Sequence, residues 1–262
     1  MQDVGTGKTA ERPIRLGGAL VTVVEPHPGQ EVAYNRWYER DHFYAGCMIG
    51  AWTIAGARFV CTRDLKDLRY PNPSPVLGDA SGASFMSVYW VLAGRFGEWI
   101  KWGTDQVRWL IDEGDRMFTD RDHVHTLMYR FRTQYEHPDG VPVELALDHR
   151  SPYAVLVVGR PAQGVDLDAV DAWFRARDLP GVVGAEFTPV PMGAGPSDVP
   201  ADDATDRFTQ LWFVDDDLPA TWSDTFAPLG PDFAAAGLGE LLAVSPFRAT
   251  IPGTDTYTDQ LR

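Results

Sequence analysis

The residues best suited to acid/base chemistry lie in one short segment, from Tyr34 to Tyr44. Within it, Tyr38, Asp41 and His42 have the spacing that places side chains on one side of a helix. An unperturbed imidazole has a pKa of about 6.5, so we expect His42 to exchange protons at neutral pH, with Asp41 or Tyr38 fixing its tautomer. The structural alternative is that His42 caps the helix C-terminus, where a cation is favourable.

A second imidazole group begins an expected strand. His123 and His125 are two residues apart, so the period-two rule places them on one face with Tyr129. Together with His42 they have the donor types of a three-histidine zinc or iron site. A His-x-His pair on a strand is more commonly a hydrogen-bonded edge or an acid/base group facing a substrate. We therefore expect no metal and take His125 as a further catalytic candidate.

Aromatic side chains should wall the site. A tryptophan stripe that includes Trp99 and Trp109 follows helical spacing, and such a stripe usually packs a helix on a sheet. A site between that sheet and its helices would suit a planar or polycyclic ligand. Arg108 and Lys101 on the same helix could pair with a ligand carboxylate, although a solvated face is their default. The expected substrate-binding residues are Trp37, Tyr89, Trp90, Trp102 and Tyr129.

The composition limits the classes of partner. The chain has 262 residues, is 44% hydrophobic and carries Lys+Arg 23 against Asp+Glu 37, for a net charge of -14. This length and apolar content can bury a sizeable core. The negative charge argues against nucleic acid or an anionic membrane as partner, because both need clustered basic residues. We expect a small hydrophobic or aromatic substrate, and a homodimer stays open.

Cysteine usage and apolar runs bear on localisation. Cys47 and Cys61 are the only cysteines, which predicts reduced thiols and a cytoplasmic protein. The longest apolar run, residues 48–57, is too short to span a membrane. Residues 5–9 (Gly-Thr-Gly-Lys-Thr) lack the glycine and the preceding strand of a phosphate-binding loop, so we interpret residues 1–13 as a polar tail.

The chain carries signs of an internal duplication. Trp37-Tyr38 and Trp173-Phe174 are 136 residues apart, and each follows an apolar β-type run. The offset falls to 128 between Gly56 and Gly184, and to 122 between Trp90 and Trp212. Loop shortening in a second copy would make the offset fall in this stepwise way.

Each half reads as β-α-β-β-α-β. The expected strands are 16–24, 53–62, 85–92 and 123–134, then 153–158, 184–190, 208–214 and 240–249; the expected helices are 30–45 and 96–113, then 167–177 and 219–236. We expect a first ferredoxin-like repeat over 14–136, a linker over 137–152 and a degenerate second repeat over 153–250. Prolines Pro228 and Pro231 break the last helix.

This order predicts an α+β fold of two tandem ferredoxin-like repeats. A single repeat leaves one sheet face bare, yet residues 19–24 and 154–158 are apolar on both faces, as in strands covered on both sides. Packing the two antiparallel sheets together into an intramolecular, pseudodimeric α/β barrel would explain this. The arrangement resembles the dimeric α/β-barrel superfamily. At offset 136, His42 falls on Asp178, so we expect the active half to be the first.

The segment around His42 also resembles a family motif. Tyr34, Asn35-Arg36, Trp37-Tyr38 and Asp41-His42 are similar to the motif of EthD-like proteins; the resemblance covers the first half well and the second only in topology. It implies a cofactor-independent cyclase, isomerase, lyase or cofactorless monooxygenase using acid/base chemistry on an aromatic or polyketide-like carbonyl compound.

Two other functions stay open. In a non-catalytic small-molecule binding protein, His42 would only hydrogen-bond the ligand. A haem enzyme resembling chlorite dismutases or dye-decolourising peroxidases would need a proximal histidine in the second half. This chain has no histidine after His149, so we expect no cofactor.

Overall fold

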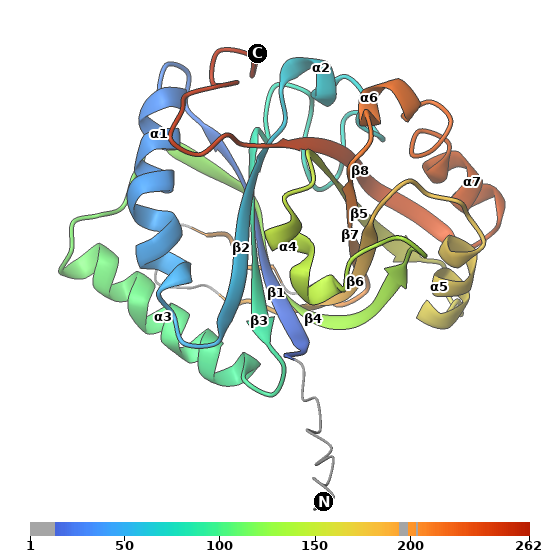
Figure 1. Cartoon of the computed structure of the whole chain (residues 1–262), viewed down its shortest axis with the longest axis horizontal. Coiled ribbons are helices and arrows are strands. Elements are labelled where there is room, and N and C mark those ends of the chain that lie inside the picture. Colours follow the sequence, from blue (N-terminus) through green and yellow to red (C-terminus); the bar gives the residue numbers. More distant parts are fainter. Residues whose placement is uncertain (1–13, 194–198, 203) are drawn as a thin grey trace, which may run out of the picture.

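The computed structural model describes residues 14–193, 199–202 and 204–262, so the expected tail 1–13 lies outside the described residues. Within these ranges eight strands form a closed antiparallel barrel in the order β1-β3-β2-β8-β5-β7-β6-β4 (Figure 1). The strands are β1 (Leu16–Pro26), β2 (Thr53–Val60), β3 (Phe85–Leu92), β4 (Arg121–Glu136), β5 (Tyr153–Pro161), β6 (Val183–Val190), β7 (Phe208–Val214) and β8 (Gly239–Ala249).

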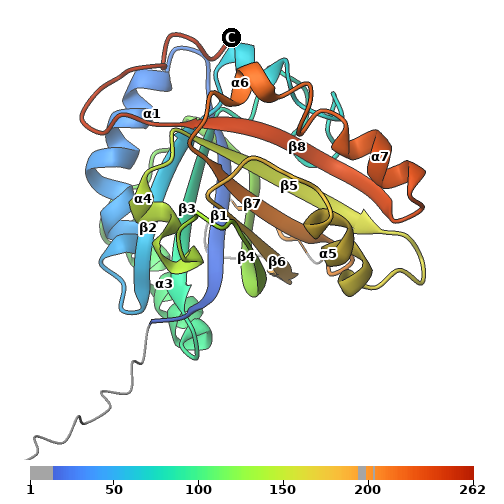
Figure 2. The same ribbon diagram turned by 45° about the vertical axis from the view of Figure 1, so that its right-hand side comes forward.

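The longer helices lie outside the barrel. α1, η1 and α3 flank the strands of the first half, and α5 and α7 flank those of the second (Figure 2). The helical elements are α1 (Glu31–Trp37), the π-helix η1 (Tyr38–Met48), α2 (Arg63–Lys66), α3 (Phe96–Asp112), the 3-10 turn η2 (Val143–Leu145), α4 (Ala146–His149), α5 (Leu167–Arg175), α6 (Leu218–Thr221) and α7 (Leu229–Ala235). None of these described helices has the length and apolar character needed to span a bilayer.

The four strands of each half follow the same spatial order around the barrel. β4-β1-β3-β2 is followed by β8-β5-β7-β6, so each half runs fourth, first, third, second. The expected α+β class with antiparallel strands is confirmed, and every expected strand is present within a few residues of its expected ends. Duplication of an ancestral repeat stays an inference from this shared order and the sequence offsets.

Apolar runs occur in β1 because both of its faces are covered. Val23 packs in the barrel interior with Met86 and Leu127, whereas its neighbour Val24 packs outward against Tyr34 of α1. Burying one such valine side chain stabilises the fold by about 1.5 to 3 kcal/mol. The two-sided burial that the sequence predicted is therefore the burial of a barrel wall beneath helices.

The segment expected to be a linker is part of the core. It contains η2 and α4, which lie between the two groups of strands (Figure 1). Val143, Ala146 and Leu147 are buried with the barrel interior, and the indole Nε1 of Trp90 donates to the Val143 carbonyl oxygen at 3.0 Å. These helical turns are too short to show a hydrophobic period, so the prolines and charges around them suggested a solvated connection.

Two expected helices differ from the observed ones. The helix expected over 30–45 is α1 continued by the π-helix η1, and the helix expected over 219–236 consists of the two short helices α6 and α7. Pro228 lies between α6 and α7, at the N-terminus of α7, which agrees with the expected break. The expected helix over 96–113 is confirmed as α3.

Two seams of unequal length join the halves. β4 pairs with β6 over eight residue pairs, from Met128–Val190 to Glu136–Val183. β2 pairs with β8 only through Phe59–Ala249 and Val60–Arg248. After β8, the chain runs back across α1 as the segment 251–262, which we call the strap (Figure 1).

Candidate functional site

A cavity of about 710 Å³ lies in the first half, between the outer faces of β1 and β4 and the helices η1 and α3. Its apolar wall includes Leu20, Val24, Trp37, Trp99, Ile100, Met117 and Met128, and its polar wall includes Thr22, His42, Arg108, Arg121, His123 and Thr126. Among the lining residues that the structure describes, the ionisable side chains other than Tyr38 and Cys47 are histidines and arginines. The described lining is therefore largely apolar, with two arginines and two histidines among its polar residues.

His42 is held on the wall of this cavity by η1. Its ring stacks on Trp37, with centroids 4.7 Å apart and planes at 20°, and meets the edge of Tyr38 at 5.3 Å. Gly46, one helical turn on, leaves the space that the ring occupies: a Cβ at this position would be 2.9 Å from His42 Cε1. Two residues of the motif, Trp37 and Tyr38, thus hold the imidazole of His42 in place.

The pKa of His42 is lowered to about 4, so the ring is neutral at pH 7. Burial is the main cause, and the electrostatic effects of Arg121 and His123 act in the same direction. Its Nδ1 is buried without a hydrogen-bond partner. The expectation of a pKa near neutrality is therefore wrong, because the sequence alone does not show that His42 is buried in an apolar cavity near Arg121.

Asp41 and Tyr38 do not set the tautomer of His42. The Asp41 carboxylate binds the guanidinium of Arg116, with Nε 3.1 Å from Oδ2 and Nη2 bonded to Oδ1. The Tyr38 hydroxyl is 3.0 Å from that of Tyr89, in a buried pair. The expected tautomer role of these two residues is wrong. Asp41 orders the segment after α3, and Tyr38 contributes a ring edge.

His123 and His125 lie on different faces of β4. His123 lines the cavity, and its Nδ1 is 2.9 Å from Thr126 Oγ1. His125 is buried, with Nε2 2.6 Å from the Tyr129 hydroxyl, which belongs to the barrel core. A bulge in β4 separates them, since Val23 pairs with His125 and Val24 with His123. The expected shared face is wrong.

This bulge also separates the ligands of the suggested three-histidine site. In the described part of the chain, no cluster of three or more histidine, cysteine, aspartate or glutamate side chains could hold a metal ion. His125, inside the barrel, is not at the cavity; burial lowers its pKa to about 4. His123 is the strand histidine that the ligand space reaches.

The expected aromatic residues divide between cavity and core. Trp37 lines the cavity, as does Tyr38. Tyr89 lies buried behind Tyr38, and Trp90 and Tyr129 face the barrel interior, because neighbouring strand residues point to opposite sides. Trp102 packs over Gly50 and does not line the cavity. Trp99, on the same helix, lines the cavity instead.

Sequence reasoning missed two groups of lining residues. Arg121 and Thr22 come from strands whose outward positions had been treated as packing surface. Residues 190–193 and Val199 come from the second half, and Met192 is held by two backbone hydrogen bonds with Asp202, at 2.8 and 3.0 Å. An outward-facing Arg in a strand of an acidic chain was the available signal for the first group.

The corresponding space in the second half is smaller. A cavity of about 370 Å³ lies beside Asp178, lined in part by Phe174, Arg177 and Trp212. Trp212 stacks on Tyr135 at 4.8 Å, so aromatic rings occupy much of the sheet face. The expectation that the larger cavity lies beside His42 rather than Asp178 is confirmed.

No protein-family model matches the sequence, and a search of curated proteins found no match. Solved structures with a similar fold include a candidate chlorite dismutase, at 12% identity, 95% coverage of this chain, 100% of that chain and a TM-score of 0.54. A variant of DypB from Rhodococcus jostii RHA1 in complex with heme matches at 9% identity over 97% and 98% of the two chains, with a TM-score of 0.51. At these identities the likeness shows the fold alone.

The second half does not fit a histidine-ligated haem. Such a site needs an axial ligand facing an open pocket. The chain has no histidine beyond His149, and His137 lies at the exposed rim of the smaller cavity, where its Nδ1 accepts from the Asp139 backbone N–H at 3.4 Å. Phe174 and Trp212 line this smaller space, of about 370 Å³. No step of the chemistry below uses haem.

Proposed function

We propose that this chain is a cofactor-independent enzyme that performs acid/base chemistry on a small hydrophobic, aromatic or polyketide-like carbonyl compound in the first-half cavity. The observation that carries the proposal is the neutral imidazole of His42 on the wall of an apolar cavity, beside Arg121 and His123. Strongly shifted histidines in clefts are candidates for chemistry because their environment has been arranged against solvation.

Neutral His42 is the proton acceptor. A C–H bond next to the substrate carbonyl breaks, an N–H bond forms on the imidazole, and the electron pair moves to the carbonyl oxygen to give an enolate. Arg121 and His123 line the same cavity, and in this proposal they stabilise the negative oxygen. The enolate beside the ring also raises the pKa of His42, because an anion favours the imidazolium.

The fate of the enolate defines the reaction class. Return of the proton to another carbon gives an isomerase, expulsion of a leaving group gives a lyase, and attack on a second carbonyl gives a cyclase. In the monooxygenase form of the proposal, dioxygen oxidises the carbanion. Each class uses the same first step at His42.

The walls favour a flat, apolar substrate. Trp37 and Trp99 present aromatic surface, and Met117, Met128 and Met192 add polarizable sulfur that packs well against rings. The volume of about 710 Å³ lies within the range of small-molecule sites.

A non-catalytic binding protein is the second candidate. The low pKa of His42 favours it, because an imidazole with a pKa of about 4 is a weak base at pH 7. In that case the ring would only hydrogen-bond a ligand carbonyl or hydroxyl.

Deuterium exchange separates these functions. The purified chain is incubated in D₂O with β-tetralone or benzoylacetone, and loss of the α-proton signal is followed by NMR. We expect exchange to fall about a hundredfold or more in His42→Ala. His149→Ala is the matched control, since His149 pairs with Asp215 and does not line the first-half cavity. Binding without His42-dependent exchange would establish the binding protein, and a Soret band would contradict cofactor independence.

A further inference from the structure

The strap joins the second half of the chain to the helix that leads into His42. After β8 it crosses α1 at one edge of the barrel (Figure 2). Asn35 Nδ2 donates to the Thr254 carbonyl oxygen at 3.0 Å, and Arg36 Nε is 3.0 Å from both carboxylate oxygens of Asp255. The Asn35 contact is buried on the helix side, since Asn35 is 3% exposed.

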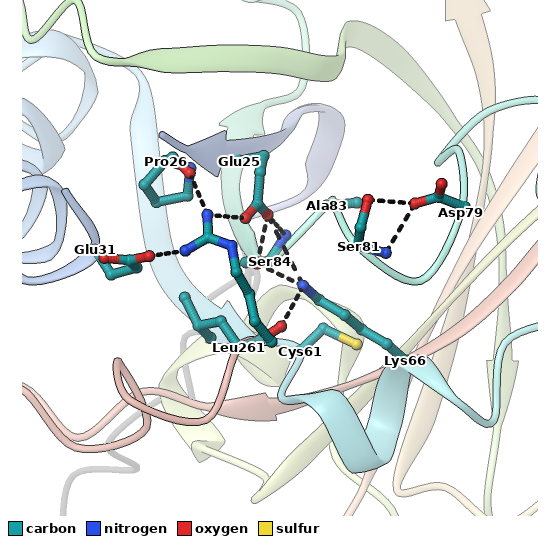
Figure 3. A network of polar contacts seen from close by, with 12 residues as sticks. Glu25, Pro26, Glu31, Cys61, Lys66, Asp79, Ser81, Ala83, Ser84 and Leu261 are labelled. Atoms are coloured by element: carbon teal, nitrogen blue, oxygen red, sulfur yellow. Dashed lines mark hydrogen bonds and ion pairs between the residues drawn. The ribbon is translucent and has the colours of Figure 1, made fainter. Parts of the chain in front are cut away.

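The end of the strap is fastened by a buried lysine. Lys66 Nζ donates to the Leu261 carbonyl oxygen and to Ser84 Oγ, both at 2.8 Å, and lies 3.9 Å from Glu25 Oε2 (Figure 3). The Lys66 side chain is 0% exposed. Arg262 also reaches Glu25, at 3.1 Å. A buried ammonium is costly unless its donors are satisfied, and here one of them is satisfied by the strap.

Lys66 has no place in the cavity chemistry, because it does not line the cavity. Burial lowers its pKa, and Glu25 acts in the opposite direction. Lys66 is connected to α1 and η1 through its hydrogen bond to the Leu261 carbonyl oxygen. Leu261 packs in one apolar cluster with Tyr34 and Tyr38.

The helix that continues α1 toward His42 has an uncommon form. η1 is a π-helix of 11 residues, and such helices occur mostly as single turns that their surroundings hold in place. Glu39, in its first turn, accepts a hydrogen bond from the strap through the Gly253 backbone N–H. Tyr38, which belongs to the same apolar cluster as Leu261, meets the His42 ring edge-on, with centroids 5.3 Å apart.

We propose that the strap is a positioning element for His42, and that Lys66 and Leu261 are the positioning residues that fasten it. A fastened strap keeps η1 wound and keeps water away from the imidazole. Only the catalytic consequence rests on the proposed function; the effect on His42 itself does not.

The strap acts on His42 through position and water access rather than through charge. The charged groups that most affect His42 lie on β4, on its own helix and after α3, and α3 adds one more at the cavity: Arg121, His123, Asp41, Arg116 and Arg108. None of these belongs to the strap, so loosening it leaves this set unchanged.

The test uses the full chain with Lys66→Met and, separately, Leu261→Glu. Amide hydrogen exchange reports attachment of residues 251–262, and the His42 C2 proton resonance followed against pH reports its pKa. We expect exchange in the strap to become at least about tenfold faster and the pKa of His42 to rise from about 4 toward 6.5. Arg63→Met is the matched control, because Arg63 is half exposed on the same short helix and its side chain pairs with Asp67.

Each outcome decides the proposal. A loosened strap with an unchanged pKa of His42 would make the strap merely structural and overturn the positioning role. Unchanged exchange in both variants would overturn the anchoring role of Lys66 and Leu261. Both readouts are independent of turnover, so a chain without activity toward any carbonyl compound would refute the proposed function while leaving this test intact.

Discussion

The two halves use one strand order to different ends. In the first, the space between sheet and helices holds a cavity of about 710 Å³ with His42 on its wall; in the second, about 370 Å³ remains beside Asp178. Near the smaller cavity, the buried carboxylate of Glu186 has several donors: it accepts from Arg132 at 2.8 Å, from Tyr135 at 2.6 Å and from Gln210 at 2.8 Å.

The first half leaves His42 Nδ1 buried without a partner. Buried polar groups in a packed core find partners, so an unsatisfied ring beside open space points to a role outside stability. The same barrel therefore carries a small cavity on one side and a larger cavity with His42 on its wall on the other.

Replacing His42 should give the largest difference in activity between variants of the two halves. We expect His42→Ala to lower kcat/KM about a hundredfold to ten-thousandfold, because general acid/base catalysis contributes that much. Asp178→Ala, at the aligned position of the second half, should leave kcat/KM unchanged. Steady-state kinetics on the compound found by deuterium exchange would measure both. Equal losses in the two variants would show that the halves are not functionally distinct.

Crowding the imidazole should have the next largest effect. In Gly46→Ala the new Cβ would lie 2.9 Å from His42 Cε1, so the ring must move. We expect a loss of about tenfold to a hundredfold in kcat/KM, since small displacements of a reacting group are costly. Gly103→Ala is the control in the same cavity, where an added Cβ meets nothing within 4 Å. If both variants keep full activity, the position of His42 is not critical.

Acid should weaken the first half before the second. His42 and His125 have folded-state pKa values of about 4, below the unfolded value of about 6.5. The unfolded chain thus binds more protons between these values, and stability present above pH 6.5 is lost as the pH falls toward 4. At pH 5 the loss is about 2 kcal/mol per histidine.

Urea unfolding at pH 7 and pH 5 measures this loss, and His42→Gln should reduce it by about one histidine's share. No histidine lies beyond His149 in the sequence, so hydrogen exchange at pH 5 should accelerate first in the first half. Acceleration that begins among β5 to β8 would reverse the assignment.

The smallest effect on activity is expected at the smaller cavity, where Tyr135 of β4 meets residues of the second half. Tyr135→Phe removes the hydroxyl that donates to Glu186 at 2.6 Å. We expect the free energy of unfolding to fall by about 1 to 3 kcal/mol, with kcat/KM unchanged. Denaturant unfolding and kinetics on one preparation would test this. A matching fall in kcat/KM would mean that the region around the smaller cavity contributes to the chemistry.

The strands were predictable because a barrel strand covered on both faces has apolar residues at nearly every position. Residues such as Val23 and Val24 are both apolar since each has a buried face to fill. The asymmetry of the cavities was also predictable, because His42 has no imidazole at its aligned position, Asp178. Both inferences depend on local pattern and spacing.

The details of the site depended on partners far away in the chain. The bulge that separates His123 from His125 is set by the register of β4 on β1. Asp41 is bound by Arg116, 75 residues later, and the low pKa of His42 comes from burial beneath elements that no local pattern positions. A period-two or period-3.6 rule carries no information about such contacts.

The two seams between the halves should differ in how easily they open. Eight residue pairs hold β4 to β6, which makes that side the hinge, whereas two pairs hold β2 to β8. Under mechanical load or thermal motion, the wall should part first at the short seam, where the fewest backbone hydrogen bonds must break. The strap runs from the end of β8 to α1, so its contacts with α1 add to the two residue pairs that join β2 to β8.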